Sequence, residues 1–438
     1  MSPLAAKLNE QISASNPHVL EMLSDYGKRI FFPSAGILAQ SAEAKTDAHL
    51  YNATIGIATE GGKAMGLESI TEQVNDLENG DYLPYAPSPG LPALRTKWQE
   101  LQLEKNPTMA GKAVSSPVVT NALTHGISLT GSLFMNPGET LVLSDHFWGN
   151  YNLFFNATLG VNMEFFTLFN EDGTFNSASF KETLLKAAEG KDQITTILNF
   201  PNNPTGYSVL KQDVEGILDA VKTVAETGTN VVVICDDAYF GLFFEDDVLK
   251  ESLFGYFADL HERVLAVKVD GATKEDYVWG LRCGFITYAS KGLDADGLKA
   301  LEQKTGGAIR ATVSNISHLS QRIVLKAFSN GDYAAQKQEK FDIMKGRYEK
   351  VKEVLSDSKY AEYFAPYPYN SGYFMTMKLE HGLDANEYRQ YLLKNKGIGT
   401  ISIGTCNIRV AFSCTEEAHL ADLFEKMYEA ASEMVAAK

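Results

Sequence analysis

The chain has few cysteines, and they give no sign of a cross-linked or metal-bound fold. Only four occur in 438 residues, in or beside apolar, strand-like segments: Cys235, Cys283, Cys406 and Cys414. No pair has the spacing of a zinc site, and the eight histidines include no His-Glu-x-x-His. The sequence therefore predicts reduced thiols, no metal site and, because thiols stay reduced inside cells, a cytoplasmic location.

Positive charge and long apolar runs are also scarce. The chain has 39 lysines and arginines against 55 aspartates and glutamates, which gives a formal net charge of −16. Nucleic acids and acidic membranes bind basic patches, and no tract rich in lysine or arginine occurs. No apolar stretch approaches the length of a membrane span, and Met1 to Glu10 has no apolar signal core. We therefore expect no nucleic-acid partner and no membrane partner.

Residues that form hydrophobic cores are abundant. The chain is 45% hydrophobic, with 24 phenylalanines and 20 tyrosines, and it is too long for one compact core. Between about 115 and 290, short apolar strands alternate with helices, which predicts an α/β domain with a mostly parallel sheet flanked by helices. After about 290, long helices, among them Tyr333 to Leu355, and a few strands predict a separate, smaller α+β domain.

The predicted domain bounds follow from this change of pattern. Residues 1–64 form an N-terminal arm and part of the small domain, 65–330 form the large domain, and 331–438 form the rest of the small domain. Within the first segment, Tyr51 to Gly62 is expected to be a short strand that ends in glycines.

Ligands of parallel sheets bind at the carboxyl ends of the strands, and one predicted strand end carries a lysine. The stretch from Val267 to Gly284 begins as a strand, turns at Asp270-Gly271 and reaches Lys274, with Arg282 eight positions later. A desolvated lysine can act as an amine nucleophile, and arginine matches the geometry of phosphate oxygens. The pair suggests pyridoxal phosphate, a cofactor with an aldehyde and a phosphate. The alternative is two solvated surface cations.

Two further strand ends carry polar side chains. Asp236 and Tyr239 follow the apolar run Val231 to Cys235, and Asn203 lies in the loop after the strand 193–199. A carboxylate at the end of a buried strand can hold a pyridine nitrogen protonated, while Tyr239 and Asn203 can donate to a ring oxygen. The ordinary alternatives are a helix N-cap for Asp236 and a simple turn for the Asn203 loop.

The three loops together resemble one enzyme family. Asn-Pro-Thr-Gly, then Asp-x-x-Tyr, then a lysine with an arginine eight positions later, each after a strand, is similar to the class I aminotransferases, the fold-type I pyridoxal-phosphate enzymes. The resemblance spans about Tyr51 to Ser413 and includes features of aspartate aminotransferases. It implies a seven-stranded-type sheet in the large domain, pyridoxal 5'-phosphate as cofactor, and a homodimer with shared active sites.

The resemblance assigns a role to each matching residue. Lys274 matches the Schiff-base lysine, Asp236 the partner of the ring nitrogen, and Tyr239 with Asn203 the donors to the ring's phenolic oxygen. Trp148, three residues before Tyr151, matches the residue that stacks on the ring. The phosphate positions are Arg282, Ala122, Leu123 and Thr124. Tyr85 matches the tyrosine that reaches the phosphate of the neighbouring subunit. The sequence departs from the family at Gly271, where serine is frequent, and at Ala122, where glycine is usual.

Other matches concern the substrate. Arg409 matches the arginine that binds the α-carboxylate, Gly56 a glycine on the substrate side, and Gly372 lies in a segment that flanks the substrate. Arg310, within Ala308 to Asn315, resembles the arginine that binds the side chain of a dicarboxylate in aspartate aminotransferases. The alternative for Arg310 is a solvated arginine at a helix end.

These matches imply a transaminase that moves an amino group between an L-amino acid (aspartate, glutamate or aromatic) and a 2-oxo acid such as 2-oxoglutarate. Another enzyme on the same scaffold stays open: a C–S lyase, a decarboxylase or a cyclopropane-forming synthase. A non-catalytic regulator that binds pyridoxal phosphate is disfavoured, because no helix-turn-helix module or basic arm precedes the domain.

Overall fold

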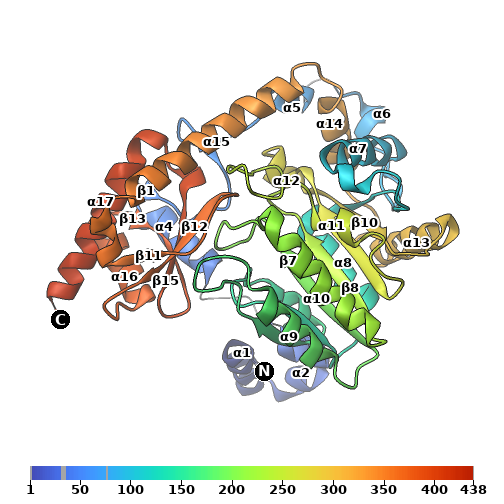
Figure 1. The fold of residues 1–438 in the computed structure, drawn as a ribbon, viewed down its shortest axis with the longest axis horizontal. Coiled ribbons are helices and arrows are strands. Elements are labelled where there is room, and N and C mark those ends of the chain that lie inside the picture. The colour runs from blue at the N-terminus through green and yellow to red at the C-terminus, as the bar shows by residue number, and fades with distance from the viewer. Residues whose placement is uncertain (1, 31–35, 75–76, 438) are drawn as a thin grey trace. The chain divides into compact units, whose positions relative to one another are not determined.

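The computed structural model describes residues 2–30, 36–74 and 77–437 (Figure 1). Its chain divides into two compact units. The large unit comprises residues 66–202 and 208–339, and the small unit comprises 1–65, 203–207 and 340–438. Parts of the predicted N-terminal and C-terminal segments, namely residues 1, 31–35 and 438, lie outside the described residues.

The large unit is built on a seven-stranded sheet, as predicted. In spatial order the strands are β4 (Val118–Asn121), β10 (Cys283–Ala289), β9 (Val264–Asp270), β8 (Asn230–Asp236), β7 (Gln193–Asn199), β5 (Thr140–Ser144) and β6 (Asn162–Phe166). Strand β10 is antiparallel to both neighbours, and the other pairs are parallel. The α/β fold class with a mostly parallel sheet is therefore confirmed.

Helices cover both faces of this sheet. On one face, Gly126 of α8 (Ala122–Phe134) lies so close to Val269 that an added Cβ would be 2.8 Å from Cγ1. On the other, α7 (Pro92–Lys105) places Trp98 against Phe285, with ring centroids 4.3 Å apart. Neighbouring strand residues point to opposite faces, so Asp270, next to Val269, faces α7, where Trp98 donates to its carboxylate. The remaining helices of the large unit include α9 (Ser177–Ala188), α10 (Val214–Glu226), the short α11 (Leu253–Phe257), α13 (Ala295–Thr312) and α14 (His318–Ala327).

Short elements connect these layers in the large unit. They are α5 (Glu68–Thr71), η1 (Glu72–Val74), α6 (Asn79–Tyr82), η2 (Pro107–Met109), η3 (Asn152–Thr158), η4 (Lys211–Asp213), α12 (Ala272–Glu275) and η5 (Trp279–Leu281). Helix α12 carries Lys274 and follows β9 directly. The end of this buried strand therefore fixes the position of Lys274.

The small unit contains a four-stranded antiparallel sheet. Its strands, in spatial order, are β11 (Phe364–Pro366), β12 (Phe374–Leu379), β15 (Asn407–Ala411) and β14 (Ile401–Ile403). Two smaller pairs are β1 (Tyr51–Asn52) with β13 (Ile398–Gly399) and β2 (Thr59–Glu60) with β3 (Lys63–Ala64). Helix α17 (Glu417–Ala436) buries Leu420, Leu423, Phe424 and Met427, the spacing of one helix face.

The remaining elements of the small unit are mainly helical. They are α1 (Pro3–Ser15), α2 (Pro17–Met22), α3 (Asp25–Arg29), α4 (Ile37–Asp47), η6 (Ser358–Glu362), α16 (Ala385–Tyr391), η7 (Leu392–Lys396) and η8 (Phe412–Cys414). Helix α15 (Tyr333–Leu355), which has the bounds predicted from the sequence, begins in the large unit and continues into the small unit.

The prediction of one strand from Tyr51 to Gly62 is wrong. Pairing stops at Asn52, whose Oδ1 accepts hydrogen bonds from the Thr54 backbone N–H and hydroxyl at 3.2 and 2.6 Å, so the chain turns there. Farther on, the carbonyls of Ile55 and Ile57 accept from side chains of η8 instead of from a neighbouring strand.

In residues 2–30, 36–74 and 77–437, no helix is long and apolar enough to cross a membrane. Across the same ranges, no group of three or more His, Cys, Asp or Glu side chains is arranged to hold a metal ion.

Candidate functional site

The lysine loop of the large unit is held by a close approach of two backbones. A Cβ added to Gly271 would lie 2.6 Å from the carbonyl oxygen of Cys283 and 2.7 Å from the Cα of Gly284. Only glycine fits there, because β10 passes directly beside the turn. This contact gives a physical reason for the departure at Gly271: a serine side chain has no room.

The Lys274 amine lies among site residues that the sequence singled out. Its Nζ is 4.8 Å from the centroid of the Tyr239 ring. Burial lowers the pKa of the amine from 10.5 to about 8; Asp236 opposes this shift, and Arg282 adds to it. A much larger fraction of the amine is therefore neutral near pH 8 than for an ordinary lysine, which favours nucleophilic attack and proton abstraction.

Asp236 ends β8 with a buried side chain whose two oxygens differ in their surroundings. Oδ2 accepts a 2.5 Å hydrogen bond from the hydroxyl of Tyr151. Oδ1 is also buried, and among the described residues it has no hydrogen-bond partner. Burial raises the pKa of Asp236 to about 6, against the opposing effects of Tyr151 and Lys274. A buried carboxylate oxygen without a donor is costly, so it fits a ligand that brings a donor, such as a protonated ring nitrogen.

Tyr151 contacts a candidate site residue, and the sequence analysis assigned no role to it. Its ring is buried and lies 5.7 Å from that of Trp148, at an interplanar angle of 81°. The only signal in the sequence was its position three residues after Trp148. The structure places the Tyr151 hydroxyl on Oδ2 of Asp236, while Oδ1 has no hydrogen-bond partner among the described residues.

The predicted phosphate turn lies at the start of α8, where backbone amides favour anions. Ala122 has φ +61, a left-handed conformation that residues with a Cβ rarely adopt. The alanine therefore keeps the kind of backbone that glycine usually supplies, and Leu123 and Thr124 continue into the helix. The Ala122 N–H donates to the carbonyl oxygen of Arg282 at 3.0 Å.

The phosphate turn and the lysine loop interlock through Gly284. A Cβ on Gly284 would lie 2.6 Å from the carbonyl carbon of Ala122, and Gly284 itself lies against Gly271. The exposed Arg282 side chain belongs to the same junction, with φ +54 and a hydrogen bond from Nη1 to the Trp279 carbonyl oxygen. The backbone thus gathers three segments that the sequence had assigned to one cofactor, and these residues fit pyridoxal phosphate.

Two predicted residues are not gathered with the others in the large unit. Tyr85 is 89% exposed. Arg310 is exposed in the last turn of α13 and donates to the hydroxyl of Ser314 at 2.5 Å. In the described chain, neither side chain hydrogen-bonds with Lys274 or Asp236.

In the small unit, Arg409 and Asn203 are bonded to each other. The buried Arg409 on β15 donates from Nη1 to Oδ1 of Asn203 at 3.0 Å and from Nη2 to the Thr54 carbonyl oxygen at 2.9 Å. Its guanidinium carbon lies 4.1 Å from the centroid of the Phe374 ring.

The loop after Asn203 is held against β12. Gly206 has φ +78, and an added Cβ would lie 1.9 Å from the Phe374 carbonyl oxygen. The Thr376 hydroxyl donates to the Pro204 carbonyl oxygen at 2.7 Å. Gly372, with φ +74, precedes the same strand. The loop's turn residues are therefore also required for close packing within the small unit.

Gly56 lies between two anchored carbonyls of the small unit. The Cys414 thiol donates to the carbonyl oxygen of Ile55, and the Ser413 hydroxyl donates to that of Ile57. These bonds fix the backbone on both sides of the glycine.

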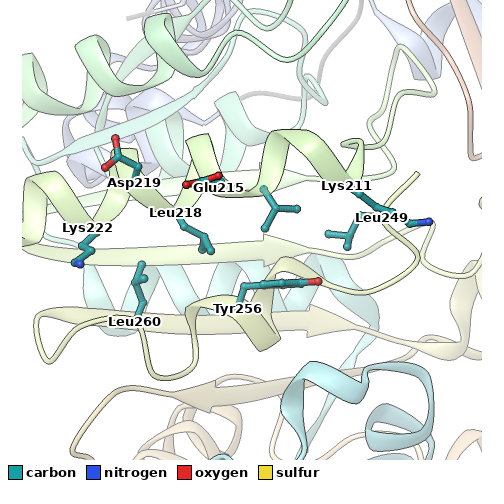
Figure 2. A pocket seen from close by; sticks show the side chains of 9 residues that line it. Lys211, Glu215, Leu218, Asp219, Lys222, Leu249, Tyr256 and Leu260 are labelled. Carbon is teal, nitrogen blue, oxygen red and sulfur yellow. The ribbon is translucent and has the colours of Figure 1, made fainter. Parts of the chain in front are cut away.

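A separate surface groove of about 480 Å³ lies between α10 and α11 (Figure 2). Its lining includes Leu218, Lys222, Tyr256 and Leu260. No predicted site residue lines it, so this groove is distinct from the candidate site.

Comparisons with known proteins agree with the fold. Residues 54–426 match the family model described as aminotransferase class I and II. A search of curated protein sequences finds no match. Similar solved structures include an aminotransferase from Anaerococcus prevotii, with 22% identity and a TM-score of 0.82 over 94% of this chain and 99% of that one.

Two further structures share the fold at lower identity. The aspartate aminotransferase from Thermus thermophilus with maleate has 18% identity and a TM-score of 0.74, over 93% of this chain and 99% of that one. The aromatic aminotransferase from Pyrococcus horikoshii has 18% identity and a TM-score of 0.72, over 90% and 99% of the two chains.

Proposed function

The chain belongs to the aminotransferase class I and II family, and from this premise we propose that it is a pyridoxal-phosphate-dependent transaminase whose cofactor is held at Lys274 and Asp236. One observation carries the proposal: Oδ1 of Asp236 is buried and, in the described residues, has no hydrogen-bond partner. The lowered pKa of the Lys274 amine supports it.

Each part of the cofactor has a matching group in the chain. Lys274 would hold the aldehyde carbon, and Oδ1 of Asp236 would accept from the ring nitrogen. Tyr239 and Asn203 would bind the phenolic oxygen, and Trp148 would stack on the ring. The phosphate would be bound by the amides at the start of α8 with Ala122 and Leu123, by the Thr124 hydroxyl, by Arg282 and, in a homodimer, by Tyr85 of the neighbouring subunit.

Bound pyridoxal phosphate supplies an electron sink for the substrate's Cα electrons. Nζ of Lys274 takes the α-proton and returns it, because its lowered pKa keeps part of the amine neutral near pH 8. Asp236 keeps the ring nitrogen protonated, and Tyr151 orients Asp236 for this task. Arg409 binds the α-carboxylate through its planar guanidinium.

For the substrates, we propose an L-amino acid donor (aspartate, glutamate or aromatic) and a 2-oxo acid acceptor such as 2-oxoglutarate. The names of the Thermus and Pyrococcus structures support these two donor classes. Arg310 would select dicarboxylates by pairing with the side-chain carboxylate in the partner's site, and Gly56 would flank the substrate.

An amino-donor screen with 2-oxoglutarate tests the proposal. We expect aspartate, glutamate or an aromatic amino acid to change the cofactor's absorbance and to yield its 2-oxo acid. The Lys274→Ala variant should show no measurable turnover, and substantial remaining transamination would contradict the assignment. Release of ammonia or carbon dioxide without an aminated product would instead indicate a lyase or a decarboxylase.

A further inference from the structure

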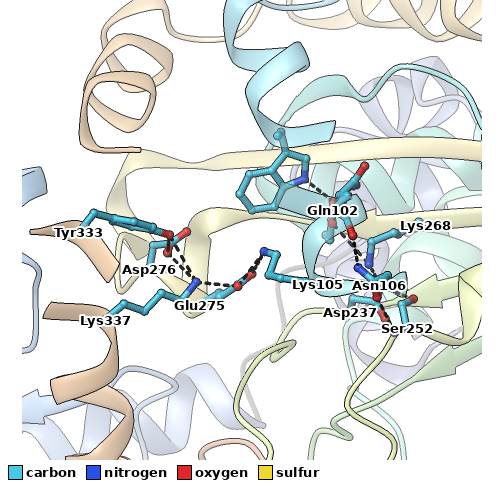
Figure 3. A network of polar contacts seen from close by, with 12 residues as sticks. Gln102, Lys105, Asn106, Asp237, Ser252, Lys268, Glu275, Asp276, Tyr333 and Lys337 are labelled. Atoms are coloured by element: carbon cyan, nitrogen blue, oxygen red, sulfur yellow. Dashed lines mark hydrogen bonds and ion pairs between the residues drawn. The ribbon is translucent and has the colours of Figure 1, made fainter. Parts of the chain in front are cut away.

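Two buried acids follow the candidate lysine directly. The side chains of Glu275 and Asp276 are 5% and 1% exposed. Buried carboxylates are costly unless they are paired. Their partners come from two distant helices: Lys105 ends α7, and Tyr333 and Lys337 lie in the first turns of α15 (Figure 3). We call these five residues the brace.

The brace is a continuous set of short contacts within the large unit. Oε1 of Glu275 lies 2.6 Å from Nζ of Lys337 and 2.8 Å from Nζ of Lys105. Oδ1 of Asp276 accepts from the Tyr333 hydroxyl at 2.5 Å and lies 3.1 Å from Nζ of Lys337. Two carboxylates therefore face two ammonium groups, so the formal charges balance.

The central ion pair persists across the neutral pH range. Burial alone would raise the pKa of Glu275, but Lys105 and Lys337 overcome that effect and lower it to about 2. Burial alone would lower the pKa of Lys337, but Asp276 and Glu275 raise it above its ordinary value. Both members of the Glu275–Lys337 pair are therefore charged at neutral pH.

The brace restrains the segment that carries Lys274. Helix α12 has only four residues, too few to be stable without tertiary contacts. On its N-terminal side, Gly271 is held by the close approach of β10. On its C-terminal side, the brace ties Glu275 and Asp276 to two long helices. The amine of Lys274 is thus positioned from both ends of α12.

The brace also contacts the Tyr239 turn. A Cβ added to Gly241 would lie 3.4 Å from Cγ of Glu275. Nζ of Lys105 is 5.6 Å from the centroid of the Phe240 ring, which follows Tyr239. Tyr239 in turn lies under the Lys274 amine. The brace therefore borders both sides of the Lys274–Tyr239 contact.

Helix α7 holds the neighbouring strand ends as well. Trp98 and Gln102 donate to the carboxylate of Asp270, which ends β9. Lys268 forms ion pairs with Asp270 and with Asp237, the residue after Asp236. One helix thus anchors the strand ends that precede Lys274 and carry Asp236, and the brace extends this anchoring to α12.

We propose that Glu275, Asp276 and Lys337 are positioning residues. They shield the Lys274 amine from water and hold it in place for the reaction. They touch neither cofactor nor substrate and act through α12. The inference rests on the proposed role of Lys274. The charged groups that act directly on the amine are Asp236 and Arg282, and both stay unchanged in the test below.

The test uses the full-length holoenzyme loaded with pyridoxal phosphate. The variants are Lys337→Met, which removes the cation, Lys337→Arg, which keeps it, Glu275→Gln, and the Lys337→Met/Glu275→Gln pair. The control is Lys345→Met, because Lys345 lies on the same helix in an exposed pair with Glu349. For each protein, kcat, KM and the midpoint pH of the cofactor's absorbance change are measured.

We expect Lys337→Met and Glu275→Gln to lower kcat by about 10- to 100-fold with little change in KM, because the amine is displaced. Water that reaches the loosened turn should raise the midpoint pH by about half a unit or more in both variants. Lys337→Arg should recover most of kcat, and the double variant should lose less than the sum of the single losses. Lys345→Met should match the wild type.

Two outcomes would overturn the proposal. One is a kcat and a midpoint pH that match the Lys345→Met control. The other is midpoint shifts of opposite sign in Lys337→Met and Glu275→Gln, which would indicate unbalanced charge and not position. If Lys337→Met does not fold, the isosteric Tyr333→Phe variant decides by the same readouts, because it removes only the hydroxyl that binds Asp276.

A separate measurement distinguishes failure of the proposed function from failure of the brace proposal. Borohydride reduction of the wild-type holoenzyme, followed by peptide mapping, should place the cofactor on Lys274. A label on another lysine would refute the proposed function. A label on Lys274 with unaffected brace variants would refute the brace alone.

Discussion

The hydroxyl of Tyr151 donates a 2.5 Å hydrogen bond to Oδ2 of Asp236, and both side chains are buried. A hydrogen bond to a carboxylate stabilises its charged form and lowers its pKa. Burial raises the pKa of Asp236 to about 6 even with this bond present. Tyr151 thus keeps the carboxylate ionised near neutral pH and fixes its orientation.

We therefore predict that Tyr151→Phe weakens Asp236 as a partner of the ring nitrogen. Without the donor, the pKa of Asp236 rises above about 6, so less of it is ionised at neutral pH. Hydrogen bonds to charged groups contribute about 1.5–3 kcal/mol, so kcat should fall by about 10-fold or more. Steady-state kinetics and a cofactor titration measure the effect. Tyr256→Phe, in the separate groove, is the matched control and should leave both quantities unchanged.

The pKa of Lys274 predicts how cofactor loading depends on pH. Only the neutral amine attacks the aldehyde, so loading of the cofactor-free protein should speed up as pH rises, with a midpoint near 8 and not near 10.5. Arg282→Gln should move the midpoint upward, because Arg282 lowers the pKa of the amine. Stopped-flow absorbance measures the rate. A midpoint that stays in place in Arg282→Gln would contradict this electrostatic effect.

The contact at Gly271 predicts a loss of stability for Gly271→Ser, the residue frequent in the family. A Cβ would lie 2.6 Å from a backbone oxygen, and forcing extra atoms into a packed site costs about 1–3 kcal/mol. Urea unfolding should show the loss. Gly280→Ser is the matched control, because an added Cβ there meets nothing within 4 Å. Equal stability of the two variants would show that β10 can move aside.

The exposed Arg310 predicts a change in selectivity. If it pairs with a dicarboxylate in the partner's site, Arg310→Ala should lower kcat/KM for aspartate and glutamate by about 10- to 100-fold, the range for loss of a charged hydrogen bond. The value for phenylalanine should change little. Parallel kinetics with the three amino acids decide the question, and equal losses would refute a selective role.

Local sequence pattern was sufficient for most secondary-structure elements. Strand β7 (Gln193–Asn199) and helix α15 (Tyr333–Leu355) have the predicted bounds, because apolar runs and helical periodicity are properties of neighbouring residues. The pattern failed at Tyr51 to Gly62. There the carbonyl oxygens of Ile57 and Ile55 accept from the side chains of Ser413 and Cys414, more than 350 positions away.

In the candidate site, too, local sequence predicts some features and tertiary contacts decide others. Lys274 and Asp236 could be proposed from the sequence because each follows an apolar strand in a short motif. The conformation of Ala122 could not, since its φ of +61 belongs to a turn that packs against Gly284, a residue distant in the sequence. The sequence marked only a missing glycine, whereas the structure shows that the turn keeps the left-handed backbone.

The sequence by itself therefore determined the family and the order of the strand-end loops, and it singled out Lys274 and Asp236 as the site residues to propose, because these features depend on short motifs. Tertiary structure alone decided their partners. Tyr151 is 85 positions from Asp236, Asn203 is 206 from Arg409, and Lys337 is 62 from Glu275. No local sequence pattern predicts such pairs, because their members lie far apart in the chain. They form when folding buries the polar and charged groups, since a buried charge is costly unless it is paired.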